Sequence, residues 1–418
     1  MDRKTHTAQE KADTSISRRK LLIAAAAGPF GVGKAFGTAA PTCTPDVDLN
    51  RRYPFYGRTE QAGIRTPPQR YVFYMTFDLT SPRRTDLQIL LARWSGAIAQ
   101  LMDGQPIGQI EPARASGVGL DTGEAMDLGP ASLTVTVGLG PKVFGATYGL
   151  AHAKPPRLRV LAQLPSDALD PRYTGGDLSL QACADDPQVA YHAVRDLARI
   201  AKDTGTAATR WTVMGFGRAS AGKGQSTPRN LLGFKDGTRN IKEDVDFDRF
   251  VWLKEGPAWQ RYGSYQVVRK IQMHIENWDT DRVSNQNAVF GRHKLSGAPL
   301  TGQDEFDMPD FHSIGPDGQL LIPANAHIRL AAHENNDGIR ILRRSYNYTS
   351  GINEVGQLDA GLLFICYLND PAHFEMLQAK LGAADALNEY ISHIGSAVFF
   401  VPPAPEEGSY IGERLFSA

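Results

Sequence analysis

Residues 233–240 read Gly233-Phe234-Lys235-Asp236-Gly237-Thr238-Arg239-Asn240. The stretch places one acidic side chain, Asp236, between two glycines. Glycine reaches backbone conformations that are closed to other residues, so Gly233 and Gly237 predict a tight turn that presents this acid. What the turn does depends on the sequence that surrounds it.

Four more segments follow in the second half of the chain. They are 290–300 (FGRHKLSGAPL), 326–330 (AHIRL), 342–346 (LRRSY) and 361–367 (GLLFICY). Together with the glycine-flanked acid, and in this order, they resemble the dye-decolourising haem peroxidases. Residues 55–64 (FYGRTEQAGI) are similar to the opening of the deferrochelatase/peroxidase branch. The resemblance therefore covers nearly all of the chain beyond its first fifty residues.

The resemblance implies haem b as the cofactor and His327 as the proximal ligand of its iron. By spacing alone His293, His312 and His333 would compete with it. A haem-ligating imidazole donates its other ring N–H to a carboxylate or carbonyl, and Glu334 and Asp337 are the candidates that sequence proximity offers. Cofactor contacts are further implied for Gly233, Phe234, Gly237, Arg343 and Phe364.

On the opposite side of the haem, the resemblance assigns catalysis to Asp236 and Arg343. A carboxylate can relay a proton between the two oxygens of peroxide, and a guanidinium can stabilise the charge that develops. Arg344 takes the role of this guanidinium if the alignment of residues 342–346 with the family shifts by one residue. Some relatives carry asparagine two residues beyond the arginine, where this chain has Ser345, which leaves a third distal group open.

The N-terminus predicts export. Ser17-Arg18-Arg19-Lys20 precedes a short apolar run and a small-residue stretch, the pattern of a twin-arginine signal over residues 1–39. The apolar run is shorter than the roughly 20 residues of a membrane-spanning helix. We expect a soluble product in the periplasm or otherwise outside the cytoplasm, with the twin-arginine translocase as a partner.

Composition limits the remaining possibilities. The chain holds 45 basic and 45 acidic residues, of which residues 1–39 hold seven and three, leaving 38 against 42 and a net charge of −4 beyond the signal. Such a balance does not favour nucleic-acid binding. Cys183 and Cys366 sit in apolar runs that predict buried free thiols, although one disulfide stays possible in an oxidising compartment.

The apolar pattern predicts an α+β fold made of two ferredoxin-like domains. Strands are expected at 71–79, 132–137, 177–183, 265–274 and 362–367, and helices at 85–102, after Asp186-Pro187, and after Asp370-Pro371. The strand-Cys-Asp-Pro-helix unit occurs twice, 184 residues apart. We therefore expect an N-terminal domain over 40–218, a connector over 219–229 rich in small and polar residues, and a haem-binding domain over 230–418.

The predicted function is an exported haem peroxidase that reduces hydrogen peroxide and oxidises phenolic or dye-like donors. The branch resemblance adds iron release from haem, with haem then a substrate and iron-uptake components as partners. The alternative is a haem carrier in which peroxide turnover is incidental. A homodimer is expected because ferredoxin-like sheets leave edges and faces that pair.

Overall fold

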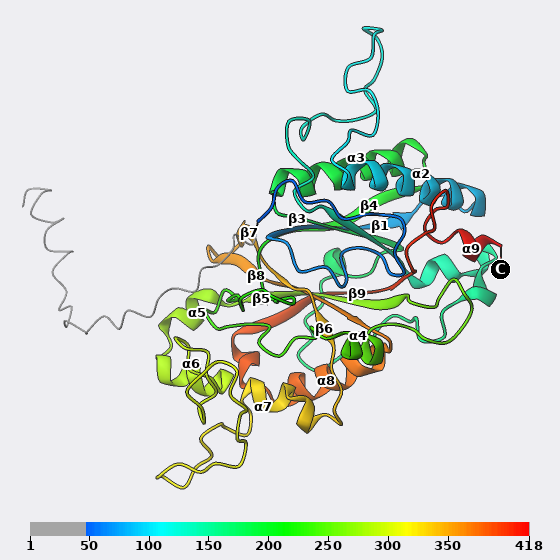
Figure 1. Ribbon diagram of the computed structural model, residues 1–418. Helices are drawn as coiled ribbons and strands as arrows, with labels where there is room; N and C mark the ends of the chain where they lie inside the picture. The colour runs from blue at the N-terminus through cyan, green and yellow to red at the C-terminus, as the bar shows by residue number, and fades with distance from the viewer. Residues whose placement is uncertain (1–46, 418) are drawn as a thin grey trace, which may run out of the picture. The chain divides into compact units, whose positions relative to one another are not determined.

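Nine antiparallel strands form one continuous sheet in the computed structural model, which describes residues 47–417 (Figure 1). The strands are β1 (Tyr71–Leu79), β2 (Thr134–Leu139), β3 (Leu178–Ala184), β4 (Ala207–Arg218), β5 (Ser264–Met273), β6 (Leu342–Arg343), β7 (Tyr346–Ile352), β8 (Leu358–Leu368) and β9 (Ile391–Val401). The predicted export signal at 1–39 and Cys43 lie outside the described residues.

Eight helices accompany the sheet in this part of the chain. They are α2 (Arg84–Met102), α3 (Pro187–Asp203), α4 (Asp244–Phe250), α5 (Ile275–Thr280), α6 (Val283–Phe290), α7 (His327–Ala331), α8 (Pro371–Ala384) and α9 (Glu413–Phe416). Two 3-10 turns matter below, η5 (His333–Asn335) and η6 (Ala386–Glu389). None of the described helices is long and apolar enough to cross a membrane.

The sheet closes on itself. Its order is β5-β9-β2-β3-β1-β4-β7-β8, and β5 pairs with β8 as well, so these eight strands form a ring while β6 lies beside β8. Two strand pairings join the halves of the chain, between β4 and β7 and between β2 and β9, where Leu139 faces Phe400. The first and second halves therefore share one closed sheet.

The helix starts follow the sequence prediction. Asp186 precedes Pro187 and accepts hydrogen bonds from the backbone N–H groups of the first turn of α3. Asp370 does the same for Ala372 at the start of α8. Each acid occupies free donors at a helix N-terminus while the proline supplies the required φ angle, so both predicted caps are confirmed.

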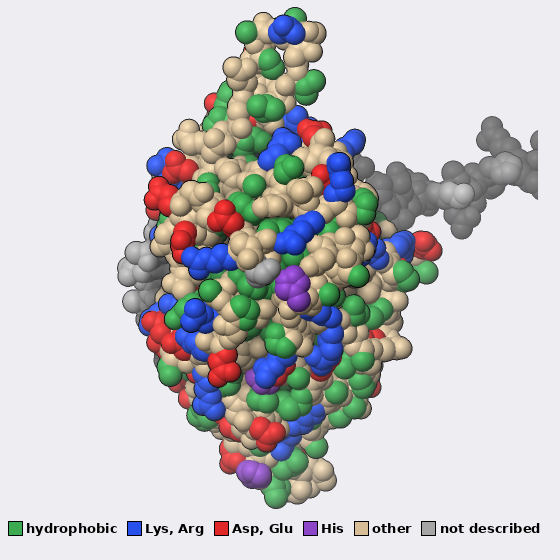
Figure 2. All heavy atoms as spheres, turned by 90° about the vertical axis from the view of Figure 1, so that its right-hand side faces the viewer, with side chains coloured by type: hydrophobic (Ala, Val, Ile, Leu, Met, Phe, Trp, Pro, Cys, Tyr) green, Lys and Arg blue, Asp and Glu red, His purple; other side chains and the backbone are tan. Residues whose placement is uncertain are grey.

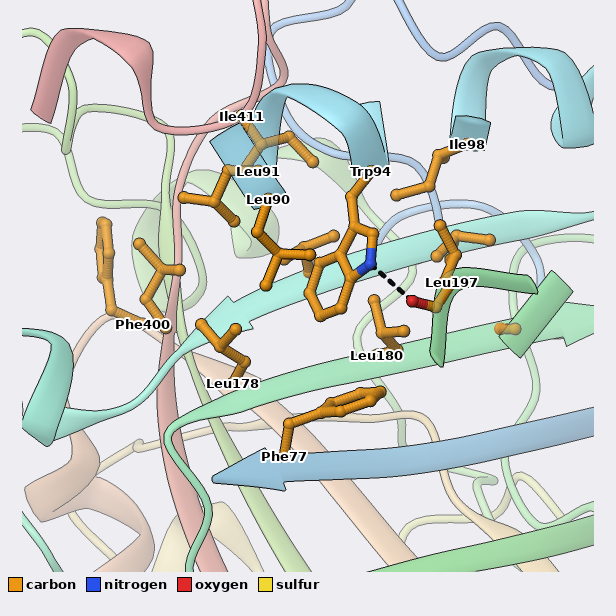
Figure 3. Packing of buried hydrophobic residues seen from close by; sticks show 14 of the residues in the cluster. Phe77, Leu90, Leu91, Trp94, Ile98, Leu178, Leu180, Leu197, Phe400 and Ile411 are labelled. Carbon is orange, nitrogen blue, oxygen red and sulfur yellow. Dashed lines mark hydrogen bonds between the residues drawn. The ribbon is translucent and has the colours of Figure 1, made fainter. Parts of the chain in front are cut away.

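The main core lies between the first half of the sheet and the helices α2 and α3. Figure 3 shows Trp94 of α2 between Leu90, Leu178 and Phe77, with its indole N–H donating to the carbonyl of Leu197 on α3 at 2.8 Å. The buried positions of α2 recur at helical spacing along one face. This face was the basis for expecting a helix over 85–102.

We expect Leu90→Ala to lower the free energy of unfolding by about 2–5 kcal/mol, because the fully buried side chain leaves a cavity among neighbours that relax only partly. Ile89 is half exposed on the same helix, so Ile89→Ala is the matched control with little expected loss. Equilibrium urea unfolding of both variants measures the difference. Equal losses in the two variants would contradict the assigned helix face.

The interior of the closed sheet carries a hydrogen-bonded polar group within an apolar lining. The Gln266 amide donates to the Tyr367 hydroxyl at 2.7 Å, and the Tyr74 hydroxyl donates to the Gln266 carbonyl oxygen at 3.0 Å. Cys183 and Cys366 are buried and free, as their apolar surroundings predicted. Figure 2 shows basic and acidic side chains interspersed over one face, in keeping with the near balance of charge.

Candidate active site

A large cavity lies between the second half of the sheet and the helices α7 and α8. It encloses about 1690 Å³ of space, its open mouth included. Strands β5, β8 and β9 form one wall, through side chains such as Ile271, Phe364 and Ile391, and α7 and α8 form another. The segment 235–239 and residues 339–343 complete the lining.

His327 begins α7 and lines this cavity. Its Nδ1 lies 2.6 Å from Oδ2 of Asp385, and its ring packs edge-on against Phe290 with 5.9 Å between centroids. Because a carboxylate only accepts hydrogen bonds, Nδ1 is the donor in this pair, and in the neutral ring Nε2 is then the nitrogen that can bind a metal ion. The side chain is 30 % exposed, so the ring is not sealed inside the protein.

Two opposed effects act on the His327 imidazole. Burial acts to lower its pKa, but the charge of Asp385 and the hydrogen bond to it outweigh burial and raise the pKa of His327 above its usual value. A more basic imidazole is a stronger donor to a metal ion.

Asp385 was missed by sequence reasoning. It follows α8, where its other oxygen, Oδ1, accepts the backbone N–H of Leu387 at 2.9 Å and so caps η6. The two candidates near in sequence lie elsewhere: Glu334 pairs with Arg239 at 2.5 Å, and Asp337 is exposed. The expectation of a carboxylate partner is met, but by a residue 58 positions away that no local pattern connects to His327.

Asp236 and Arg343 form an ion pair on the cavity lining. Arg343 Nη1 lies 2.5 Å from Oδ1 of Asp236, and the amide of Asn230 donates to the other carboxylate oxygen at 3.3 Å. Both charges act on the His327 imidazole, which places the three groups around one space.

Asn240 fixes the position of the arginine backbone. Its side-chain oxygen accepts the N–H of Arg343, and its side-chain amide donates to the carbonyl of Arg343, both at 2.8 Å. Asn240 itself is buried. The segment that carries Asp236 is thereby locked to the short strand β6 that carries Arg343.

Gly237 has a conformational reason to be glycine. Its φ is +99°, and a Cβ there would lie 2.9 Å from the backbone of Ser220 and Ala221. The neighbouring acid is therefore held by a turn that no larger residue fits. Gly237 also lines the cavity.

Two of the expected cofactor contacts are not on the cavity lining. Phe234 is buried behind the wall, stacked on Phe290 with 4.0 Å between ring centroids. Gly233 faces the side chain of Lys294. Both residues precede the run 235–239, which lines the cavity, and they pack behind the wall that carries Asp236. Phe364 and Arg343 do line it.

The open alternatives are resolved by position. His293 and His312 are exposed and away from the cavity, and His333 lines it but lies 3.4 Å from the Arg239 guanidinium. Arg344 is buried against the first half of the chain, bonded to Gln69 at 2.5 Å and to the carbonyl of Thr66. Arg343, and not Arg344, therefore lies on the cavity lining.

Ser345 does not supply the third distal group. Its hydroxyl accepts the backbone N–H of Ile365, and its own N–H donates to the Ser220 hydroxyl. Asn230 stands beside Asp236 instead and lines the cavity. The sequence signal for Asn230 was its place just before the glycine-flanked turn.

The rest of the lining is largely apolar, with basic groups among it. Six lining residues are Lys or Arg, namely Lys235, Arg239, Arg269, Arg292, Arg340 and Arg343. All but Arg292 form an ion pair, with Glu305, Glu334, Asp167, Asp246 and Asp236 respectively. The arrangement combines a basic imidazole, an apolar interior, and a carboxylate held by a guanidinium. It suits a broad apolar ligand that needs one nitrogen ligand.

Two family models cover most of the chain. The Dyp-type peroxidase N-terminal model matches residues 61–217, and the Dyp-type peroxidase C-terminal model matches residues 227–406. Among curated proteins, Deferrochelatase of Yersinia pestis is 38% identical over 424 residues, which cover 97% of this chain and 96% of the relative. Deferrochelatase of Escherichia coli (strain K12) is 38% identical over 417 residues, with 96% of each chain covered.

Solved structures give the same picture. A DyP-type peroxidase from Streptomyces coelicolor superposes with a TM-score of 0.82 at 40% identity, covering 90% of this chain and 100% of that one. Ferric DtpA from Streptomyces lividans superposes with a TM-score of 0.81 at 39% identity, with 90% and 100% covered.

Proposed function

The chain belongs to the Dyp-type peroxidase family, and we propose that His327 binds the iron of its haem while Asp236 and Arg343 act on hydrogen peroxide from the opposite side. It is a haem-dependent peroxidase with haem b as cofactor. These roles are supported most directly by one observation: His327 and the ion pair of Asp236 with Arg343 line the same largely apolar cavity.

The residues present fit a haem. Apolar side chains from β5, β8 and α8 offer faces for a flat macrocycle. His327 offers Nε2 because Nδ1 is occupied by Asp385. When bound, the haem supplies the redox-active iron at which peroxide is reduced.

The protein groups handle the proton and the charge. The carboxylate of Asp236 accepts the proton of one peroxide oxygen and returns it to the other, which leaves as water. The Arg343 guanidinium stabilises the negative charge that grows on the departing oxygen and holds the carboxylate in place. Asn230 orients the second carboxylate oxygen.

Asp385→Asn is expected to lower haem affinity about 10–100-fold, because an outer-shell partner fixes the orientation and basicity of the ligating histidine. The exposed Asp304 serves as a matched control in Asp304→Asn. Dissociation constants come from titrating each apo variant with haem and following its absorption. Unchanged affinity in Asp385→Asn would remove Asp385 from the proposed iron site.

Release of iron from haem is the second activity, supported by relatives named Deferrochelatase along nearly the full chain. We propose that it serves iron supply, with haem as substrate in the same cavity. The rival is a carrier for haem. The ion pair favours the enzyme, since carriage alone does not need a proton relay facing the iron ligand.

Product analysis separates these roles. The holo protein is given peroxide and a phenolic donor in one reaction, and haem with a reductant in another, while apomyoglobin receives any haem that leaves intact. Donor oxidation and free porphyrin are expected to exceed haem transfer. Rapid transfer to apomyoglobin, with neither donor oxidation nor porphyrin, would establish the carrier.

Architecture and location complete the proposal. The strand order β2-β3-β1-β4 in the first half matches β7-β8-β5-β9 in the second, with helices α2 and α3 corresponding to α5–α6 and α8. This supports a duplicated ferredoxin-like unit, with domains at 40–218 and 230–418 around the connector 219–229.

The basic and apolar pattern of residues 1–39 supports twin-arginine export to the periplasm. We further propose a homodimer and iron-uptake partners.

A further inference from the structure

Four polar residues, three of them buried, form a cluster in the first half of the chain, where the haem cavity has no lining residue. Asp121 and Glu124 belong to the segment 103–133 between α2 and β2, and His192 and Asp196 belong to α3. Figure 1 shows that segment rising beyond α2 and α3. The cluster is thus a contact between a long connecting segment and a helix of the core.

The helix contributes two ligand-type side chains on one face. His192 and Asp196 are four residues apart, a spacing that stacks side chains on adjacent turns. Asp196 is fully buried, and neither of its carboxylate oxygens has a hydrogen-bond partner in the described part of the chain. A buried carboxylate without a donor is costly, so it signals a group that completes it.

The cations nearby do not complete Asp196. The closest guanidinium nitrogen, Nη1 of Arg199, lies 3.6 Å away, and Arg195 pairs with Glu124 at 3.3 Å with its own side chain about half exposed. The charge of this carboxylate is therefore only partly balanced.

The imidazole stands between two carboxylates without bonding to either. His192 Nε2 lies 3.5 Å from Oδ2 of Asp121 and 3.5 Å from Oδ2 of Asp196. An N–H···O bond is about 2.7–3.2 Å long, so both distances are too long for one. Ligands bound at 2.0–2.2 Å to a tetrahedral metal ion stand about 3.3–3.6 Å apart, which matches both.

The other side of the ring has the partners of a metal-bound histidine. Nδ1 lies 3.3 Å from the Thr122 hydroxyl and 3.2 Å from a carboxylate oxygen of Glu124. Histidines that bind metals through one nitrogen present the other to such a group, which fixes ring orientation. Asp121 is fixed too, since its oxygens accept the backbone N–H groups of Gly123 at 2.7 Å and Ile107 at 2.9 Å.

We propose that Asp121, His192 and Asp196 bind a divalent transition-metal ion, with Zn²⁺ the best match. The three ligand atoms lie within 4.8 Å of one another, and all three residues are buried. One nitrogen and two carboxylate oxygens suit Zn²⁺ or Mn²⁺, and the two 3.5 Å distances from His192 to the carboxylates favour Zn²⁺, with water as the fourth ligand. The ion anchors the segment 103–133 to α3.

Metal binding to the holo protein tests this assignment. After treatment with a chelator, the wild type is titrated with Zn²⁺ and with Mn²⁺ by calorimetry, and metal content is counted separately from haem iron. One equivalent of Zn²⁺ is expected, with a higher thermal midpoint and slower proteolysis within 103–133, because a ligand of the folded state stabilises it.

Variants locate the ion. Asp196→Asn and His192→Gln are each expected to weaken Zn²⁺ binding more than about 100-fold, exceeding the usual effect of an outer-shell change. Asp203→Asn, at the exposed end of the same helix, is expected to bind as the wild type does. A wild type that takes up neither ion and keeps its midpoint overturns the proposal. So does uptake that both site variants retain in full, because the ion then lies elsewhere.

Discussion

His327→Ala is expected to abolish stable haem binding, with affinity reduced by more than the ~100-fold that loss of an outer-shell partner can cost. The side chain is the imidazole that lines the cavity with Nε2 free, because Asp385 occupies Nδ1. Removing it leaves the apolar walls without a nitrogen ligand. The fold should survive, since the ring is partly exposed and contributes little to the core.

Haem content per purified chain and the absorption of the haem band measure this effect. His312→Ala is the matched control, because His312 is exposed and away from the cavity. Added imidazole should restore haem binding to His327→Ala, since the small ligand enters the space that the side chain vacates. An unchanged absorption spectrum in His327→Ala would assign the iron ligand to another residue.

The second large effect is expected for Asp236→Asn, which should slow peroxide turnover by about 10²–10⁴-fold while haem content stays near that of the wild type. Asparagine keeps the shape of the side chain and can still accept the Arg343 guanidinium through its oxygen. It does not accept a proton as a carboxylate does. The loss should therefore fall on the proton transfer and leave cofactor binding intact.

Peroxide consumption per bound haem, measured at several peroxide concentrations, distinguishes this role from a structural one. A lower kcat at equal haem content is the expected pattern, and Asp304→Asn is the control for the same chemical change at an exposed site. If Asp236→Asn instead loses haem, and the haem that remains turns over peroxide at the normal rate, Asp236 supports the cavity wall and does not transfer the proton.

Local patterns in the sequence predicted the starts and the buried faces of helices, because these depend on residues that are close together in the chain. The Asp-Pro starts of α3 and α8 appear as predicted, because an acid before proline satisfies the first free N–H groups wherever the helix packs. The helix over 84–102 follows from one apolar face. Closure of the sheet was not predictable in this way, since β2 meets β9 across more than 250 residues.

Some residues of the site could be found from the sequence, and others only from the folded structure. His327, Asp236 and Arg343 were found through segments that resemble a family, and the structure brings them to one cavity. Asp385 lies 58 residues from His327, and in the sequence it looks like an ordinary helix-end acid. Phe234 was expected to contact the cofactor because it belongs to the segment 233–240. Its ring instead stacks on Phe290 behind the cavity wall.

A double-variant cycle on Asp236 and Arg343 tests most directly whether these two residues form the peroxide site of the cavity. Peroxide consumption is measured at equal haem content for Asp236→Asn, Arg343→Leu and the double variant. Residues that act as one unit are far from additive, so we predict that the double variant is no slower than the slower single variant. Rates in which the two losses simply multiply, or a wild-type rate in Asp236→Asn, would contradict the account.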